Sequence, residues 1–228
     1  MGLEPGDHLG AEASLLERYG VARASLREAL RLLEAQGAVN IRRGAGGGAL
    51  VASPEPAQLA GFLAMTLQMG KGSLLTILET RSVIEPTMAA LAARRRTQEQ
   101  LDQLKECTDG LLQYRSDSVV FHRLNRQFHD LVAQASGNLL LASLVPALSW
   151  MTEALGLELN TRVRKRLAID KQGIVDAIAE GDSWRASELM SRMIMGFGQL
   201  NESDPEMLNK VVVWADVDEL LEQHLSSE

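Results

Sequence analysis

The chain has 228 residues and a hydrophobic content of 46%, which is enough for one large domain or two modest domains with packed cores. Its net charge of -7 argues against a generally basic coat for nucleic acid, and its single cysteine, Cys107, excludes an internal disulfide framework. No signal peptide is visible, and the longest apolar run, residues 139–151, is too short to span a bilayer. We therefore expect a cytoplasmic protein without a membrane anchor.

Charge is distributed unevenly along the chain. Residues 1–53 contain six arginines, no lysine and six acidic residues, so this part is neutral, and the remainder carries the whole net negative charge. A neutral domain with a local arginine cluster, joined to an acidic domain, fits specific DNA binding with little non-specific affinity.

The stretch between Gly20 and Gly37 predicts one amphipathic helix, preceded by a shorter helix over residues 12–19. Both glycines stand just past the end of a helix, where a left-handed conformation is common. The predicted apolar face consists of Leu26, Ala29, Leu30 and Leu33. The predicted cationic edge consists of Arg23, Arg27 and Arg31. Because successive residues are rotated by ~100°, this edge points outward while the leucines pack.

A small hairpin is predicted next, with strands at residues 39–41 and 49–51 around a tip that is rich in arginine and glycine. A helix with a basic edge followed by such a hairpin is typical of a winged helix-turn-helix, in which the helix enters the major groove and the hairpin lies against the DNA backbone. The alternative interpretation is that the basic edge is an ordinary solvated helix face and the hairpin has no role in DNA binding.

The ordered pattern resembles the GntR family of bacterial transcription regulators. The matching residues are the run 9–12, the helix end 17–20, residues 20–23 and 26–30, Leu33, Glu34, Gly37 and the tip at residues 42–48. The resemblance implies DNA contacts from the helix and the wing, and the candidate residues are Arg23, Ser25, Arg27, Arg31, Arg42, Arg43, Gly46 and Gly47.

Four departures from the family pattern predict weakened operator binding. Gly10 replaces a proline, Ala13 replaces an arginine that often contacts DNA, and Ala22 replaces a serine that would cap the helix, which is worth about 1 kcal/mol. Only four residues precede Pro5, so the first helix of the family's domain is either absent or encoded upstream of the start of this sequence.

The rest of the chain reads as mainly α-helical, after a linker at residues 53–56. We expect domains at residues 1–53 and 54–204 and a tail at 205–228, which holds a short strand at 211–214 and a helix at 216–225. The predicted helices of the second domain are 57–69, 73–95, 97–115, 118–135, 139–158, 165–180 and 182–200.

The helical part resembles the ligand-sensing domain of the FadR subgroup of the same family, through residues 79–81, 84–86, 125–138 and 174–182. Many members of the subgroup bind a divalent metal through one aspartate and three histidines, and the metal with an arginine then holds a carboxylate effector. Those ligand positions fall on Asn125, His129, Lys171 and Met193, and the arginine is Arg81. Because one ligand of four is kept, we predict that there is no metal and no other cofactor.

The same substitutions suggest a direct anion site. Lys171 would supply the positive charge of the missing metal and pair with an anionic head group together with Arg81, while Asn125 and His129 donate hydrogen bonds. In the alternative, Lys171 is a surface lysine and His129 is a buried, hydrogen-bonded histidine. Seven methionines of the helical part also allow a fatty acyl effector: Met65, Met69, Met88, Met151, Met190, Met193 and Met195.

The function predicted from these features is a ligand-responsive transcription regulator that binds a palindromic operator as a homodimer. The alternative is a helical small-molecule-binding protein with weakened or lost DNA binding. We do not expect an enzyme, because His129 and Asp130 are adjacent on a helix and point about 100° apart, and no nucleophile elbow or phosphate loop is present.

Overall fold

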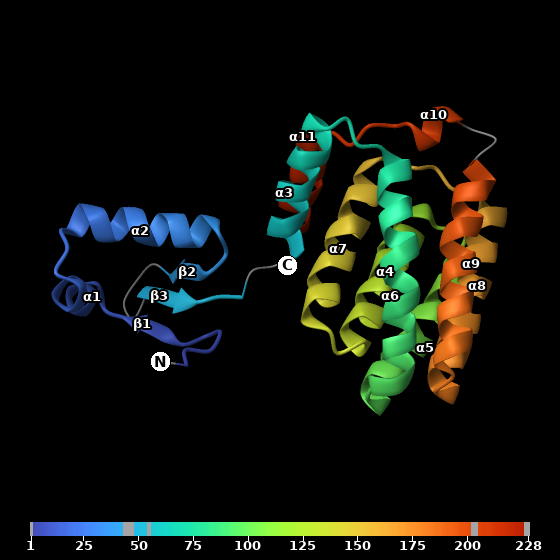
Figure 1. The fold of residues 1–228 in the computed structure, drawn as a ribbon, viewed down its shortest axis with the longest axis horizontal. Helices are drawn as coiled ribbons and strands as arrows, with labels where there is room; N and C mark the ends of the chain where they lie inside the picture. Colours follow the sequence, from blue (N-terminus) through green and yellow to red (C-terminus); the bar gives the residue numbers. More distant parts are fainter. Residues whose placement is uncertain (1, 43–47, 54–55, 202–204, 226–228) are drawn as a thin grey trace. The chain divides into compact units, whose positions relative to one another are not determined.

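The computed structural model describes residues 2–42, 48–53, 56–201 and 205–225. The chain forms two compact units, Met1–Gln58 and Leu59–Glu228 (Figure 1). The first contains short helices and a small sheet, and the second is helical, so the predicted fold class is confirmed. The predicted linker includes residues 54–55, which lie outside the described residues.

The N-terminal unit contains one strand more than the sequence predicted. Strand β3 lies between β1 and β2 in an antiparallel sheet, and Val39 pairs with Val51 while Arg42 pairs with Gly48. The unpredicted strand β1 has three residues, too few to show an alternating pattern. The elements are β1 (His8–Gly10), α1 (Glu12–Tyr19), α2 (Arg23–Ala35), β2 (Val39–Arg42) and β3 (Gly48–Val51).

Glycine ends the first helix as predicted. Gly20 adopts a left-handed conformation with φ 62°, and its N–H donates to the carbonyl of Leu16. The start of α2 also follows the prediction, because Ala22 at the N-cap provides no side-chain hydrogen bond. The backbone N–H groups in the first turn of α2 therefore have no N-cap side chain to donate to.

The predicted apolar face of α2 is only partly buried. Leu26 is buried and Leu30 is half-buried, whereas Ala29 is exposed and Leu33 is 39% exposed. Helix α2 contacts α1 and β2. Within the described part of this unit, these elements cover only one side of the apolar face of α2. The buried apolar side chains of the unit are Leu15, Leu26, Val39, Ala49 and Leu50.

In the helical unit, α4 contacts α6, α7, α8 and α9 and so forms the centre of the bundle (Figure 1). Its apolar core includes Phe121, Phe128, Met88 and Ile178, all fully buried. The helices are α3 (Pro56–Met69), α4 (Leu74–Arg95), α5 (Gln98–Gln113), α6 (Ser118–Ala135), α7 (Leu139–Ala154), α8 (Thr161–Glu180), α9 (Ser183–Asn201), α10 (Pro205–Leu208) and α11 (Trp214–Leu225).

The connection between α7 and α8 differs from the prediction. Helix α7 ends at Ala154 instead of residue 158, because Gly156 adopts a left-handed conformation with φ 60°. Helix α8 begins four residues earlier than predicted, since the Asn160 side chain accepts hydrogen bonds from the backbone N–H groups of Arg162 and Val163. A loop at residues 155–160 results.

The C-terminal segment packs as part of the helical unit. The prediction of a strand at residues 211–214 is wrong, because the structure has only an isolated bridge there, between Val211 and Ser73. Val212 and Val217 are buried, α11 packs against α7, and the Trp214 N–H donates to Gln68 Oε1 at 2.7 Å. Among the described residues, no helix is long and apolar enough to cross a membrane.

Candidate functional site

Helix α2 presents its predicted cationic edge to solvent. Arg23, Ser25, Arg27 and Arg31 are all exposed. Arg23 Nε lies 2.9 Å from the Glu12 carboxylate, whereas Arg27 has no ion pair or hydrogen bond to any described residue. Exposed ion pairs contribute roughly 0–1 kcal/mol, so the pairing to Glu12 holds Arg23 only weakly.

Of the wing, the structure describes the two strands. Arg42 is exposed at the end of β2, opposite Gly48. The predicted contacts Arg43, Gly46 and Gly47 lie in residues 43–47, outside the described residues.

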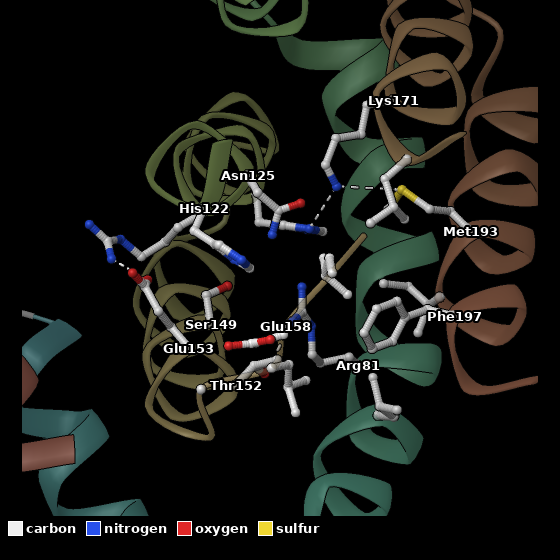
Figure 2. Close-up of a pocket in the computed structure, with 18 of the residues that line it drawn as sticks. Arg81, His122, Asn125, Ser149, Thr152, Glu153, Glu158, Lys171, Met193 and Phe197 are labelled. Carbon is white, nitrogen blue, oxygen red and sulfur yellow. Dashed lines mark hydrogen bonds and ion pairs between the residues drawn. The ribbon is translucent and has the colours of Figure 1, made fainter. Parts of the chain in front are cut away.

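A cavity of about 390 Å³ lies inside the helical unit (Figure 2). It is bounded by side chains of α4, α6, α7, α8 and α9 and by the loop at residues 155–160. All five effector-site residues predicted from sequence line it: Arg81, Asn125, His129, Lys171 and Met193. Four helices thus bring together residues that lie up to 112 positions apart in the sequence.

Lys171 is the most unusual residue of the cavity. It is 1% exposed, so the alternative of a surface lysine is wrong. Its Nζ lies 3.1 Å from His129 Nε2, 3.5 Å from Met193 Sδ and 4.6 Å from the centre of the Phe128 ring, and it has no ion pair with a described carboxylate. Burial lowers the pKa of Lys171 to about 7, and the positive charge of Arg81 adds to this effect against the opposing charge of Glu85.

Glu85 is a central residue of the site that the sequence analysis missed. Its side chain is fully buried, with Oε1 2.5 Å from Arg81 Nε and Oε2 2.8 Å from His129 Nδ1. Burial alone would raise the pKa of Glu85, but the charge of Arg81 and the neighbouring His129 outweigh it and lower that pKa to about 2. The available signal was the spacing of four residues from Arg81, which brings two side chains together on one helix face.

His129 agrees with the alternative interpretation, a buried and hydrogen-bonded histidine, and not with the predicted contact to an effector. It is 3% exposed, and its two ring nitrogens face Lys171 and Glu85, although the contact to Glu85 is not aligned as a hydrogen bond. Burial lowers the pKa of His129 to about 3 against the opposing charge of Glu85, and the charges of Lys171 and Arg81 add to the lowering, so the ring is neutral. His129 therefore holds Lys171 in place, and its predicted hydrogen bond to an effector is not available in this arrangement.

The cavity also contains polar groups with spare hydrogen-bonding capacity. Ser149 is 5% exposed, and its Oγ has no hydrogen-bond partner among the described residues. Asn125 projects toward the same space as Lys171 and Arg81 (Figure 2), and Arg81 Nη1 donates to Thr152 Oγ1 at 3.3 Å. A buried hydroxyl without a partner costs about 1–3 kcal/mol, which a ligand can recover by bonding to it.

The donor set does not fit the divalent metal of the FadR subgroup. The Lys171 amine occupies the point at which His129 and Met193 converge, and an ammonium repels a dication. Within the described ranges, no three His, Cys, Asp or Glu side chains are grouped so that they could hold a metal ion.

The methionines do not form a lipid pocket. Of the seven named from the sequence, Met193 alone is among the residues that line the cavity. Met88, Met151 and Met190 are buried in the core, whereas Met65, Met69 and Met195 are exposed. The methionine argument for a fatty acyl effector is therefore not supported.

Comparisons with known proteins give two family matches and several relatives. Residues 2–48 match the bacterial regulatory proteins of the gntR family, and residues 76–195 match the FCD domain. The chain is 30% identical to the HTH-type transcriptional regulator LutR of Bacillus subtilis over 199 residues, which cover 82% of this chain and 88% of LutR. It is 31% identical to the HTH-type transcriptional repressor NanR of an Enterobacter species over 153 residues, which cover 65% of this chain and 58% of NanR.

Among solved structures, the GntR protein of Streptococcus agalactiae matches with a TM-score of 0.70 and 24% identity, covering 87% of this chain and 91% of that one. At this level of identity, the likeness concerns the fold.

Proposed function

The chain belongs to the GntR family of bacterial regulatory proteins, and from that membership we propose that a small anionic effector in its helical unit controls operator binding. Its relatives are HTH-type transcription regulators, so the chain is a DNA-binding regulator and not an enzyme. The observation that carries the effector proposal is the buried amine of Lys171, which faces a cavity without a carboxylate partner.

The effector is an anion because of the charge balance in the cavity. In the buried cluster the positive Arg81 pairs with the negative Glu85 and His129 is neutral, so protonated Lys171 has no carboxylate partner of its own. The other carboxylates that line the cavity are Glu153, which pairs with Arg126, and Glu158. A single carboxylate of the effector compensates the charge of Lys171, and proximity to two cations makes its hydrogen bonds strong. Ser149 and Asn125 are placed to bond to polar atoms of the same molecule.

On the DNA side, α2 is the element that enters the major groove. Arg27 reaches base edges without breaking an existing contact, and Arg23 exchanges Glu12 for a phosphate. The N–H groups at the uncapped start of α2 add a further anchor for a phosphate, since helix N-termini attract anions.

A homodimer on a palindromic operator completes the proposal. One winged helix reads a short half-site, and two-fold symmetry doubles it, with half-site centres about 10 bp apart in the simplest docking. Effector binding then changes the balance between two dimer states that differ in affinity for the operator. The site of action is the cytoplasm, where the operator is accessible.

The test uses fluorescence anisotropy of the full chain with a labelled fragment from upstream of its own gene, across a salt series, beside an unrelated fragment of equal length. We expect tighter binding to the upstream fragment, and weaker binding as salt rises. A screen of carboxylates then identifies compounds that change this binding. Lys171→Ala should abolish the response and leave operator binding intact, and an unchanged response would disprove the role of Lys171.

The alternative function, ligand binding with lost DNA binding, is favoured by the exposed apolar side chains of α2, including Leu32 at 59% exposure. Equal and weak binding to both fragments, together with an effector-induced thermal shift, would support that alternative instead.

A further inference from the structure

Lys171 differs from every other lysine of the chain. Lys71, Lys105, Lys165 and Lys210 are exposed, whereas Lys171 is 1% exposed. Its amine contacts an imidazole nitrogen, a thioether sulfur and an aromatic ring, none of which carries the negative charge that usually accompanies a buried ammonium.

This environment favours the neutral amine, which is the reactive form of lysine. Two features that activate a lysine nucleophile are desolvation and a neighbouring cation, and Lys171 has both, through its burial and through Arg81. Burial lowers the pKa of Lys171 to about 7, so near neutral pH a much larger share of this side chain is the neutral amine than for a lysine with the ordinary pKa of about 10.4.

The groups around the amine suit a carbonyl compound that also bears a carboxylate. Lys171 and Arg81 project toward the same space (Figure 2), and Ser149 Oγ lines that space without a hydrogen-bond partner among the described residues. Arg81 therefore fits a carboxylate, Lys171 fits the adjacent carbonyl carbon, and the Ser149 hydroxyl fits the carbonyl oxygen. An α-keto acid places these functions on neighbouring carbon atoms.

We propose that Lys171 captures an α-keto acid covalently, as a reversible iminium, in the cavity between α4, α6, α7, α8 and α9. The inference rests on the effector cavity proposed above and specifies the chemistry of its ligand. The captured molecule keeps one positive charge at nitrogen, and its own carboxylate compensates that charge.

The reaction is balanced without an oxidant or a reductant. The ammonium first releases one proton, and the nitrogen lone pair then forms a bond to the carbonyl carbon, whose π electrons move to oxygen. The attacking nitrogen then passes one of its two protons to that oxygen, directly or through solvent, which gives a neutral carbinolamine and restores the nitrogen lone pair. Protonation of the hydroxyl then expels water as the nitrogen lone pair forms the C=N bond, and the remaining N–H proton stays on the iminium. His129 Nε2, at 3.1 Å, positions the amine by accepting one of its hydrogens.

The experiment treats the full-length wild-type protein with pyruvate and sodium cyanoborohydride, which reduces an iminium to a stable secondary amine. Peptide mapping by mass spectrometry then locates the adduct. We expect saturable labelling of Lys171, at least about tenfold above any other lysine, because Lys171 is the lysine that lines the cavity and is desolvated there. Lys71, Lys105, Lys165 and Lys210 are internal controls in the same sample.

Two further measurements separate this inference from the effector proposal. Lactate, which lacks the carbonyl, should bind through its carboxylate and compete with labelling without forming an adduct. Lys171→Arg should retain the charge and lose the adduct, while Lys165→Arg, on the exposed side of the same helix, should label Lys171 normally.

Labelling of Lys171 no stronger than that of the exposed lysines would overturn covalent capture. If pyruvate then still raised the melting temperature of the wild type and not of Lys171→Ala, the ionic effector site would stand without the covalent step. If neither compound bound, the proposal that the cavity takes small carboxylates would fail as well.

Discussion

The two units of this chain differ in the capping of their helices and in the burial of their charged side chains. In the helical unit, side chains of Thr97, Asp117, Asn138 and Asn160 accept hydrogen bonds from the free N–H groups at helix starts. In the N-terminal unit, α1 and α2 begin at alanines that provide none. The helical unit hides charged groups in its interior, whereas the N-terminal unit exposes its arginines.

This difference corresponds to two kinds of ligand. DNA is large and binds from outside, so its phosphates can be reached by exposed arginines and by the free N–H groups at uncapped helix starts. A small effector is enclosed, so the helical unit must hold Arg81, Glu85 and Lys171 buried and in register around a cavity. That arrangement requires a rigid, well-capped bundle, because buried charges are tolerated only in fixed geometry.

The largest expected effect is on the buried pair of the helical unit. Glu85→Gln leaves Arg81 without its buried counter-charge and should lower the unfolding free energy by about 3–5 kcal/mol. Trp150, Trp184 and Trp214, the three tryptophans of the chain, all lie in the helical unit, so urea denaturation followed by tryptophan fluorescence reports on that unit.

The matched control for this change is Glu79→Gln, at an exposed position of the same helix, which should change the unfolding free energy by less than about 0.5 kcal/mol. Equal effects of the two substitutions would contradict the role given to Glu85.

The second effect is a pH dependence caused by Lys171. Its folded-state pKa of about 7 lies below the ordinary 10.5, so between these values the unfolded chain binds more protons and stability rises with pH. Relative to Lys171→Met, the wild type should gain up to about 1.4 kcal/mol per pH unit between pH 7 and 9. The measurement is urea unfolding at several pH values, with Lys165→Met as the exposed control. If the unfolding free energies of wild type and Lys171→Met changed in parallel with pH, a lowered pKa of Lys171 would be contradicted.

A third effect concerns the exposed arginines of the N-terminal unit. Arg27→Ala should weaken operator binding by about 1–3 kcal/mol if the side chain contacts a base, and should leave the tryptophan-detected stability unchanged. Anisotropy titrations measure this change, and Arg166→Ala, an exposed arginine of the helical unit, is the control. A similar loss for both variants would indicate a general charge effect and argue against a specific contact.

The smallest effect is on the helix starts. Ala22→Ser should stabilise α2 by about 1 kcal/mol, whereas Asn160→Ala should destabilise α8 by a similar amount, because one gains and the other loses a capping hydrogen bond. Amide hydrogen exchange resolved by helix measures both. Unchanged exchange in α2 of Ala22→Ser would show that the start of this helix is already satisfied by other groups.

Much of the secondary structure was predictable from local patterns. Gly20 ended a helix as predicted, and Ala22 left α2 uncapped. The errors arose where a single residue overrode a continuing pattern: Gly156 ended α7, and Asn160 started α8 early, which created the loop that borders the cavity. The strand β1 is formed by pairing with β3, a distant partner that a local pattern does not reveal.

By itself, the sequence determined the two-part architecture, the exposed arginines of α2 and the five residues that converge on the cavity, because each follows from periodicity or from the family pattern. Only the tertiary structure decided that Lys171 is buried without a carboxylate and that Glu85 joins Arg81 to His129. Burial and charge pairing depend on which helix faces meet, and residues on different helices have no fixed relation in the sequence. The pKa of Lys171, and with it the chemistry proposed for the cavity, is therefore a property of the packed bundle.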